Sequence, residues 1–431
     1  MNHMMNESIT LLDYIAEHCE KSIDRALLLA RRPLWKRSCP DLSDKDFIRL
    51  GLLRGISPVD SGRHFLQLNE EVYGEICPHS TYFKALKSSR RMEMLKATEK
   101  QSYEIHCESM ILEGVDYLKQ FEELNDYTVY AADGHYVDHA YHTPKDSNGK
   151  VYAAGFIYAM NLRNGLLKPL SCVTNGTIKH QEIPVLRQYV DQENRGKNKS
   201  VKDLYVYDKA ATDYAWWNKQ KYHQNYMISL LKENSTAVWC ERIPFDKNAE
   251  INIGIESYST YESKGVKFSV VKYFDPETGK EFDFVSTLPE SIEPGIIAVL
   301  YYKRWTIEKA FNNNKSNLKE KKAWSSNMNS LNNEMRFTTM SYNIMRVFEE
   351  TSKTQNPEKI HPSEKKYTDT LKKRDLDAKQ GFFVNPLLYQ ERIARISSYT
   401  IRAIQNAIVT GKSLVSLMSQ LLEKLVPRLN V

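Results

Sequence analysis

The sequence is poor in cysteine and has neither an ATP-binding loop nor a long apolar run. Its 6 cysteines are widely spaced and none belongs to a C-x-x-C pair, which argues against a zinc finger or a disulfide framework and suits a reducing cytoplasm. No G-x-x-x-x-G-K motif is present, so ATP use is not expected. Apolar runs fall short of the ~20 residues of a membrane span, and the N-terminus lacks a signal-peptide core. We therefore expect a cytoplasmic protein without membrane contact.

Charge of one sign is only slightly in excess, but it is concentrated. The formal net charge is +6 over 431 residues, and two stretches, 195–202 and 303–322, are strongly basic. Basic clusters beside a functional site contact the phosphates of a polyanion, although many such runs are only solvated faces. Both interpretations stay open on composition alone.

The first hundred residues have the apolar spacing of several short helices. One is expected over 8–32, and Ser43 has the features of an N-cap for the next. Basic residues on the last of these helices could form a helix-turn-helix reader of a DNA end: Lys84, Lys87, Arg90 and Arg91. A plain helical packing domain explains the same pattern, and we favour it.

Two aspartates each follow an apolar run that is typical of a buried strand. Asp133 follows VYAA and Asp208 follows LYVY. The order of predicted elements over 127–231 is three strands, a helix, a strand, a helix and a strand, which predicts a mixed α/β sheet covered by helices. Ligands bind such sheets at the carboxyl ends of the strands, so we expect both aspartates at that edge.

A segment of alternating apolar and polar residues separates Asp208 from a later helix. Residues 235–289 predict an antiparallel β segment, which we interpret as an insertion that leaves the acids on either side of it close in space. In the following helix, Tyr301, Arg304, Glu308 and Lys315 are spaced so that they share one face. At about 100° per residue their offsets fall on a stripe roughly 60° wide. An ordinary exposed helix with an Arg304–Glu308 pair is the alternative.

These residues resemble a known signature. The spacing of Tyr301, Arg304, Glu308 and Lys315 is similar to the Tyr-(2)-Arg-(3)-Glu-(6)-Lys pattern of a large group of bacterial insertion-sequence transposases of the DDE class. Asp133 and Asp208 resemble the two catalytic aspartates of that group. The resemblance covers about 127–330, including the β insertion.

The resemblance implies a ribonuclease H-like core that nicks the ends of a mobile element and joins its 3′-hydroxyls to target DNA. It implies that Asp133, Asp208 and Glu308 are catalytic and hold two Mg²⁺ ions, for which Mn²⁺ substitutes. It also implies that Tyr301, Arg304 and Lys315 contact phosphates. The expected partners are the terminal inverted repeats, target DNA and a second copy in a synaptic homodimer, with the protein associated with the nucleoid when bound.

The resemblance and the composition together predict six regions. They are a helical DNA-binding region over 1–100, the first part of the catalytic core over 101–234, the β-rich insertion over 235–295, the second part of the core with the Glu helix over 296–350, a polar linker over 351–380, and a helical region over 381–431. Within the last region, helices are expected over 389–409 and 414–425.

Several alternatives remain. A structure-selective nuclease on the same core would cut without joining, and a decayed copy would bind DNA without cutting. His135, Asp138, His139 and His142 are close enough in sequence for a transition-metal site, but a polar hairpin explains them better. Trp239 could stack on a displaced base, although we expect a buried anchor.

Overall fold

A computed structural model describes most of the chain between residues 41 and 355. Within that range it leaves out 58, 60, 75–76, 141, 174–177, 194–200, 210–211, 234, 276–278 and 317–321, and beyond it describes only 372, 376, 379–380, 402, 405–406 and 410. The helices expected over 8–32, 389–409 and 414–425 therefore lie outside the described residues, apart from a few isolated positions. No helix in the described part of the chain is long and apolar enough to cross a bilayer.

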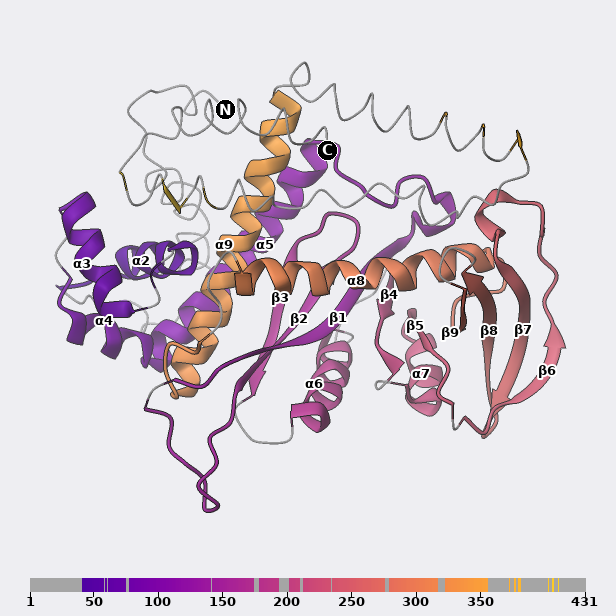
Figure 1. The fold of residues 1–431 in the computed structure, drawn as a ribbon, viewed down its shortest axis with the longest axis horizontal. Helices are drawn as coiled ribbons and strands as arrows, with labels where there is room; N and C mark the ends of the chain where they lie inside the picture. Colours follow the sequence, from indigo (N-terminus) through magenta and orange to yellow (C-terminus); the bar gives the residue numbers. More distant parts are fainter. Residues whose placement is uncertain are drawn as a thin grey trace.

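A nine-stranded mixed sheet runs from the centre of the molecule to one end of it, where β6 to β9 lie (Figure 1). Its strand order is β3-β2-β1-β4-β5-β9-β8-β7-β6. The parallel pairs are β1 with β4 and β4 with β5, and the other pairs are antiparallel. The strands are β1 (Tyr127–Val137), β2 (Ala154–Asn161), β3 (Leu167–Val173), β4 (Lys202–Val206), β5 (Asn225–Leu230), β6 (Val238–Arg242), β7 (Ile255–Ser263), β8 (Val266–Asp275) and β9 (Lys280–Ser286).

Helices cover both faces of this sheet, as the order of elements predicts. The described helices are α2 (Asp44–Ile56), α3 (Gly62–Tyr73), α4 (His79–Leu86), α5 (Ser89–Leu112), α6 (Ile178–Glu193), α7 (Tyr214–Lys221), α8 (Pro294–Ser316) and α9 (Met328–Gln355), with the short 3-10 helices η3 (Glu122–Leu124) and η5 (Glu250–Asn252). Helices α6 and α7 pack on one face, and α8 crosses the other (Figure 1). Helix α9 continues to Gln355, so the first positions of the predicted linker are helical.

Alternation along the strands decides which residues meet α8. Val129 and Ala131 of β1 belong to the apolar core that includes α8, whereas Tyr130 and Ala132 belong to the core under α6 and α7. Because side chains alternate between faces with a period of two, Asp133 is on the same face as Val129 and Ala131. The buried alternation in β1 thus directs this carboxylate toward α8.

The predicted β insertion is antiparallel, and it extends the main sheet. Strand β9 pairs with β5 through Ile228 opposite Ser286, so β9, β8, β7 and β6 continue the sheet beyond the parallel strands. The chain returns directly from β9 into α8, which packs back over β1, β4 and β5. This return explains how residues on both sides of the insertion approach each other.

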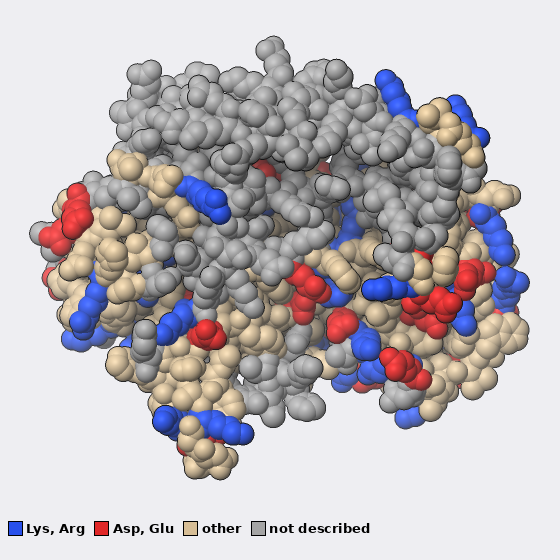
Figure 2. All heavy atoms as spheres, in the orientation of Figure 1, with Lys and Arg blue, Asp and Glu red and all other residues tan. Residues whose placement is uncertain are grey.

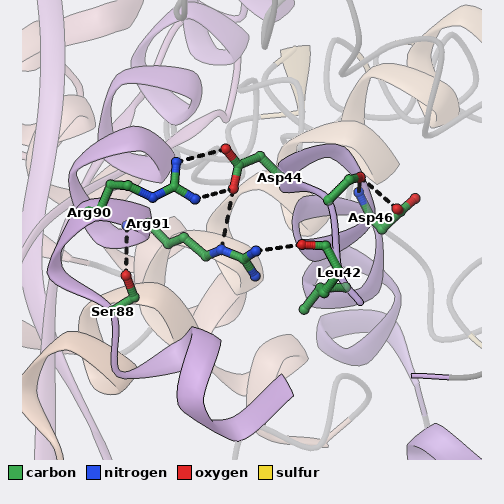
Figure 3. Close-up of polar contacts among 7 residues, drawn as sticks. Leu42, Asp44, Asp46, Ser88, Arg90 and Arg91 are labelled. Carbon is green, nitrogen blue, oxygen red and sulfur yellow. Dashed lines mark hydrogen bonds and ion pairs between the residues drawn. The ribbon is translucent and has the colours of Figure 1, made fainter. Parts of the chain in front are cut away.

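Helices α2 and α5 are joined by arginine–carboxylate contacts. Ser43 caps α2, as predicted, by accepting from Asp46 N over 3.1 Å. From α5, Arg90 makes two hydrogen bonds to Asp44, at 2.8 and 2.5 Å, and buried Arg91 donates to the carbonyl of Leu42 (Figure 3). Two of the four basic residues considered for DNA reading are thus engaged in helix packing.

Helix α5 is a single helix of 24 residues that packs against α9. Two polar residues in its middle, Ser102 and His106, are only 1% and 0% exposed. Polar residues on the packed face of a helix weaken the apolar periodicity that identifies it.

A buried carboxyl on α5 gives the stability of the protein a specific pH dependence. Burial raises the pKa of Glu99 from 4.5 to about 7, although Arg336, 3.4 Å away, lowers it. The folded state therefore binds this proton more tightly than the unfolded state does. The resulting stabilisation is complete below pH 4.5 and is lost as the pH rises through about 7.

We therefore expect the free energy of unfolding of the wild type to fall by at most ~3 kcal/mol between about pH 5 and pH 8 through this group. In Glu99→Gln this part of the decrease is absent, and urea unfolding at several pH values measures the difference. Glu104→Gln, on the exposed side of the same helix, is the control and keeps the wild-type slope. Parallel slopes for the wild type and Glu99→Gln would contradict the prediction.

Candidate active site

Helix α8 carries the predicted stripe across the sheet. The main chain of its first turn is so close to η5 that a Cβ on Gly295 would stand 1.8 Å from the carbonyl oxygen of Ile251. The Gly295 N–H also donates to Asn252 Oδ1 over 3.0 Å. These contacts fix where the helix begins. Its side chains then pack against β1, β4 and β5.

An arginine on this helix joins two of the three predicted acids. Arg304 Nη1 lies 3.0 Å from Glu308 Oε1 and 3.6 Å from Asp133 Oδ2. The side chain of Arg304 is 7% exposed, that of Asp133 23% and that of Glu308 44%. The contact brings together a strand and a helix that are more than 150 residues apart in sequence. The i,i+4 pair expected for an exposed helix does form, but its arginine is buried and also reaches the sheet.

The groups around Arg304 stabilise its positive charge. Burial by itself lowers the pKa of Arg304, but interactions with Tyr301, Asp133, Glu308 and Asp208 raise it above its ordinary value. Asp133 and Glu308 lie within ion-pair range of this guanidinium, and Asp208 adds to the electrostatic stabilisation of its charge.

Asp133 lies within its strand and not at the end of it. Strand β1 continues to Val137, and Asp133 is paired with Tyr158 of β2. The expectation that the strand stops at Asp133 is wrong, because antiparallel pairing with β2 continues as far as Val137 opposite Ala154. The parallel pairing with β4 does end earlier, at Ala131 opposite Val206, so Asp133 still projects just beyond the edge shared by these two strands.

Asp208 is where the sequence places it, just past the carboxyl end of β4. The strand ends at Val206, and Asp208 is exposed in the turn that follows. Its Oδ1 accepts from the N–H of Lys209 over 2.7 Å. Because β1 and β4 are parallel, Asp208 and Asp133 lie at the same edge of the sheet.

Of the other two residues of the stripe, Tyr301 is described with its side chain and Lys315 only by its place in α8. Tyr301 is only 4% exposed, and its ring lies 5.1 Å from that of Phe284 and 5.3 Å from the Arg304 guanidinium. Burial raises its pKa, so the phenol keeps its proton. Lys315 belongs to α8, but its side chain is outside the described part of the chain. The predicted phosphate contacts of Tyr301, Arg304 and Lys315 stay predictions.

Only part of each basic stretch lies among the described residues. Most of 195–202 is outside the described residues. In 303–322, Lys303 is 5% exposed and donates to the carbonyl of Tyr117 over 3.1 Å, and Arg304 is ion-paired. On the face seen in Figure 2, the described acidic and basic side chains are interspersed. The described cations at this point of α8, Lys303 and Arg304, are therefore buried and bonded within the protein.

The donor chemistry of the site suits a hard divalent cation. Carboxylate oxygens from three elements are the ligands that Mg²⁺ and Mn²⁺ prefer. Among the residues that the structure describes, however, no three His, Cys, Asp or Glu side chains are grouped so as to hold an ion. A guanidinium nitrogen of Arg304 instead lies 3.0 Å from a Glu308 oxygen and 3.6 Å from an Asp133 oxygen. The carboxylates are thus the right type of ligand for such a cation, and the Arg304 guanidinium lies between two of them, Asp133 and Glu308.

The alternative histidine site does not assemble. His135 is 2% exposed with its ring 5.2 Å from that of Phe311, whereas His139 and His142 are exposed. Asp138 takes part in a backbone bridge to Lys322. The histidines and Asp138 are close in sequence because they lie at the end of β1 and in the loop after it, which agrees with the interpretation as a polar hairpin.

Two exposed tryptophans add candidate contacts for a nucleic acid. Trp239 is 56% exposed on the edge strand β6, so the expectation of a buried anchor is wrong and base stacking stays a prediction. Trp305, next to Arg304 on α8, is 53% exposed, and we did not expect it from the sequence. Its position outside the apolar stripe of the helix was the available signal.

The sequence matches a known protein family. A family model described as "Transposase DDE domain" matches residues 124–344, which is just over half of the chain. The matched range includes Asp133, Asp208 and Glu308 together with all nine strands. No curated protein matches the sequence.

Proposed function

Since this chain belongs to the DDE transposase family, we propose that it nicks the ends of an insertion sequence and joins the freed 3′-hydroxyls to target DNA. The nine-stranded mixed sheet with helices on both faces agrees with a ribonuclease H-like core of that family. The observation that carries the proposal is the approach of Asp133 and Glu308 to one buried arginine across a long insertion.

Asp133, Asp208 and Glu308 are the proposed metal ligands and catalytic residues. The family generally uses divalent metals, and Mg²⁺, with Mn²⁺ as a substitute, suits these oxygen donors. The chemistry such ions supply is activation of the attacking oxygen and neutralisation of charge on the leaving oxygen. The protein's own part is to hold carboxylates from β1, the β4 edge and α8 on one side of the sheet, where a phosphodiester can approach.

The DNA contacts are proposed from position. Tyr301, Arg304 and Lys315 are on the helix that carries Glu308, and phenol, guanidinium and ammonium groups all donate to phosphate oxygens. Because Tyr301 and Arg304 are buried, the DNA backbone must enter the site to reach them, or Arg304 must turn outward. The proposed substrates are the terminal inverted repeats and target DNA, bound by a homodimer that synapses two ends in the cytoplasm.

Product analysis tests the proposal. With Mg²⁺, a supercoiled donor carrying the protein's own element and a labelled target, the full-length protein should give nicks at the element ends followed by joining of labelled 3′ ends to target. Nicks without joined products would indicate the structure-selective nuclease. Binding to the ends without metal-dependent nicking would indicate the decayed DNA-binding protein.

A further inference from the structure

We propose that Arg304 is an internal competitor for the catalytic cation, so that its guanidinium must leave the space between Asp133 and Glu308 before a divalent ion can bind there. The inference rests on the proposed function, because it concerns the same carboxylates. It adds a control step within the protein: the metal-free site is closed by the protein's own positive charge.

The geometry shows the guanidinium in the place of a shared cation. Its Nη1 atom lies 3.0 Å from a Glu308 oxygen and 3.6 Å from an Asp133 oxygen. One nitrogen thus approaches carboxylates from two different elements, as a bridging ion would. Asp133 and Glu308, which would share the ion, share this guanidinium instead.

Burial makes the competition strong. The Arg304 side chain is 7% exposed, so its attraction to the two carboxylates is weakly screened by solvent. The guanidinium cannot lose its proton at any working pH, so the positive charge is removed only when the side chain moves. The site is more open on the other side, because Glu308 is 44% exposed and can turn toward an arriving ion.

A positioning role for Arg304 predicts the opposite behaviour. If the guanidinium oriented Asp133 and Glu308 for an ion that binds beside it, its removal would disorder the ligands and weaken metal binding. If it competes, its removal leaves two unneutralised carboxylates close together and strengthens metal binding. The sign of the change in affinity therefore separates the two roles.

The experiment measures Mn²⁺ binding to the full-length, DNA-free protein by isothermal titration calorimetry, with the metal-bound signal in electron paramagnetic resonance as a second readout. We expect Arg304→Gln to bind Mn²⁺ at least about tenfold more tightly than the wild type, and Arg304→Lys to lie between them. Arg187→Gln is the matched control: it breaks an arginine–carboxylate pair of 2.9 Å with Asp213, outside the site, and should change the affinity less than twofold.

Equal or weaker Mn²⁺ binding by Arg304→Gln would overturn the inference, and the Lys variant gives the same test if the Gln variant does not fold. Asp133→Asn distinguishes this failure from failure of the proposed function. If Asp133→Asn loses Mn²⁺ binding while Arg304→Gln equals the wild type, the catalytic proposal stands and the competition does not exist. If Asp133→Asn binds Mn²⁺ as the wild type does, the proposed metal site is wrong and the inference with it.

Discussion

Replacing Glu308 with Gln should lower metal-dependent nicking by at least about 1,000-fold while DNA binding is retained. The change keeps the size of the side chain and removes one charged oxygen ligand. Interactions of a metal with the reacting phosphate supply several kcal/mol of transition-state stabilisation, and each 1.4 kcal/mol is worth a factor of ten in rate. Asp133→Asn and Asp208→Asn should have effects of the same size, because the three carboxylates act as a unit.

The measurement is the initial rate of strand cleavage in Mg²⁺, with DNA affinity determined separately by a gel-shift assay in Ca²⁺ or without metal. Asp213→Asn is the matched control. Asp213 is five residues beyond Asp208 and caps α7 by accepting from Trp216 N over 3.1 Å, and Asn caps helices equally well. Wild-type-like nicking by Glu308→Gln would refute the assignment, as would equal losses in all four variants.

Arg346→Met should destabilise the protein by about 3–5 kcal/mol, because it leaves buried carboxylates without a counter-charge. Arg346 on α9 is fully buried and donates to Glu349 at 2.9 Å, to Glu350 at 3.1 Å and to the Tyr117 hydroxyl at 2.6 Å. The loop that holds Tyr117 also accepts a hydrogen bond from Lys303, the residue before Arg304. This network therefore supports α8 as well as α9.

Urea unfolding followed by circular dichroism measures the effect. Lys209→Met is the control, since Lys209 and Glu233 form an exposed pair at 3.7 Å, and exposed pairs contribute about 0–1 kcal/mol. A decrease of less than about 1 kcal/mol in Arg346→Met would show that the carboxylates find other partners or bind protons.

The strands of the sheet could be predicted because the pattern that identifies a strand is formed by neighbouring residues. Runs such as LYVY alternate between two buried faces, and strands β4 and β5 lie close to the predicted positions. The end of β1 could not be placed, because it depends on pairing with β2, a partner that begins more than fifteen residues later. Where pairing with another strand determines the end of a strand, the end cannot be identified from the sequence of that strand alone.

The candidate site was predictable in its members and not in its arrangement. The spacing of Arg304 and Glu308 on one helical face follows from 3.6 residues per turn, and the structure brings them to Asp133. That Arg304 would be buried and bridge two acids depends on how α8 packs over β1, which no local pattern specifies. The exposure of Trp239 was missed for the same reason, since β6 is an edge strand only by virtue of the strand order.

The most direct test is a crystal structure of the full-length protein soaked with Mn²⁺, with the ion located by its anomalous scattering. The account predicts Mn²⁺ bound to carboxylate oxygens of Asp133, Asp208 and Glu308 at roughly 2.0–2.3 Å, with the Arg304 guanidinium turned out of the space between Asp133 and Glu308. Mn²⁺ bound elsewhere, with Arg304 still bridging these two carboxylates at saturating metal, would contradict it.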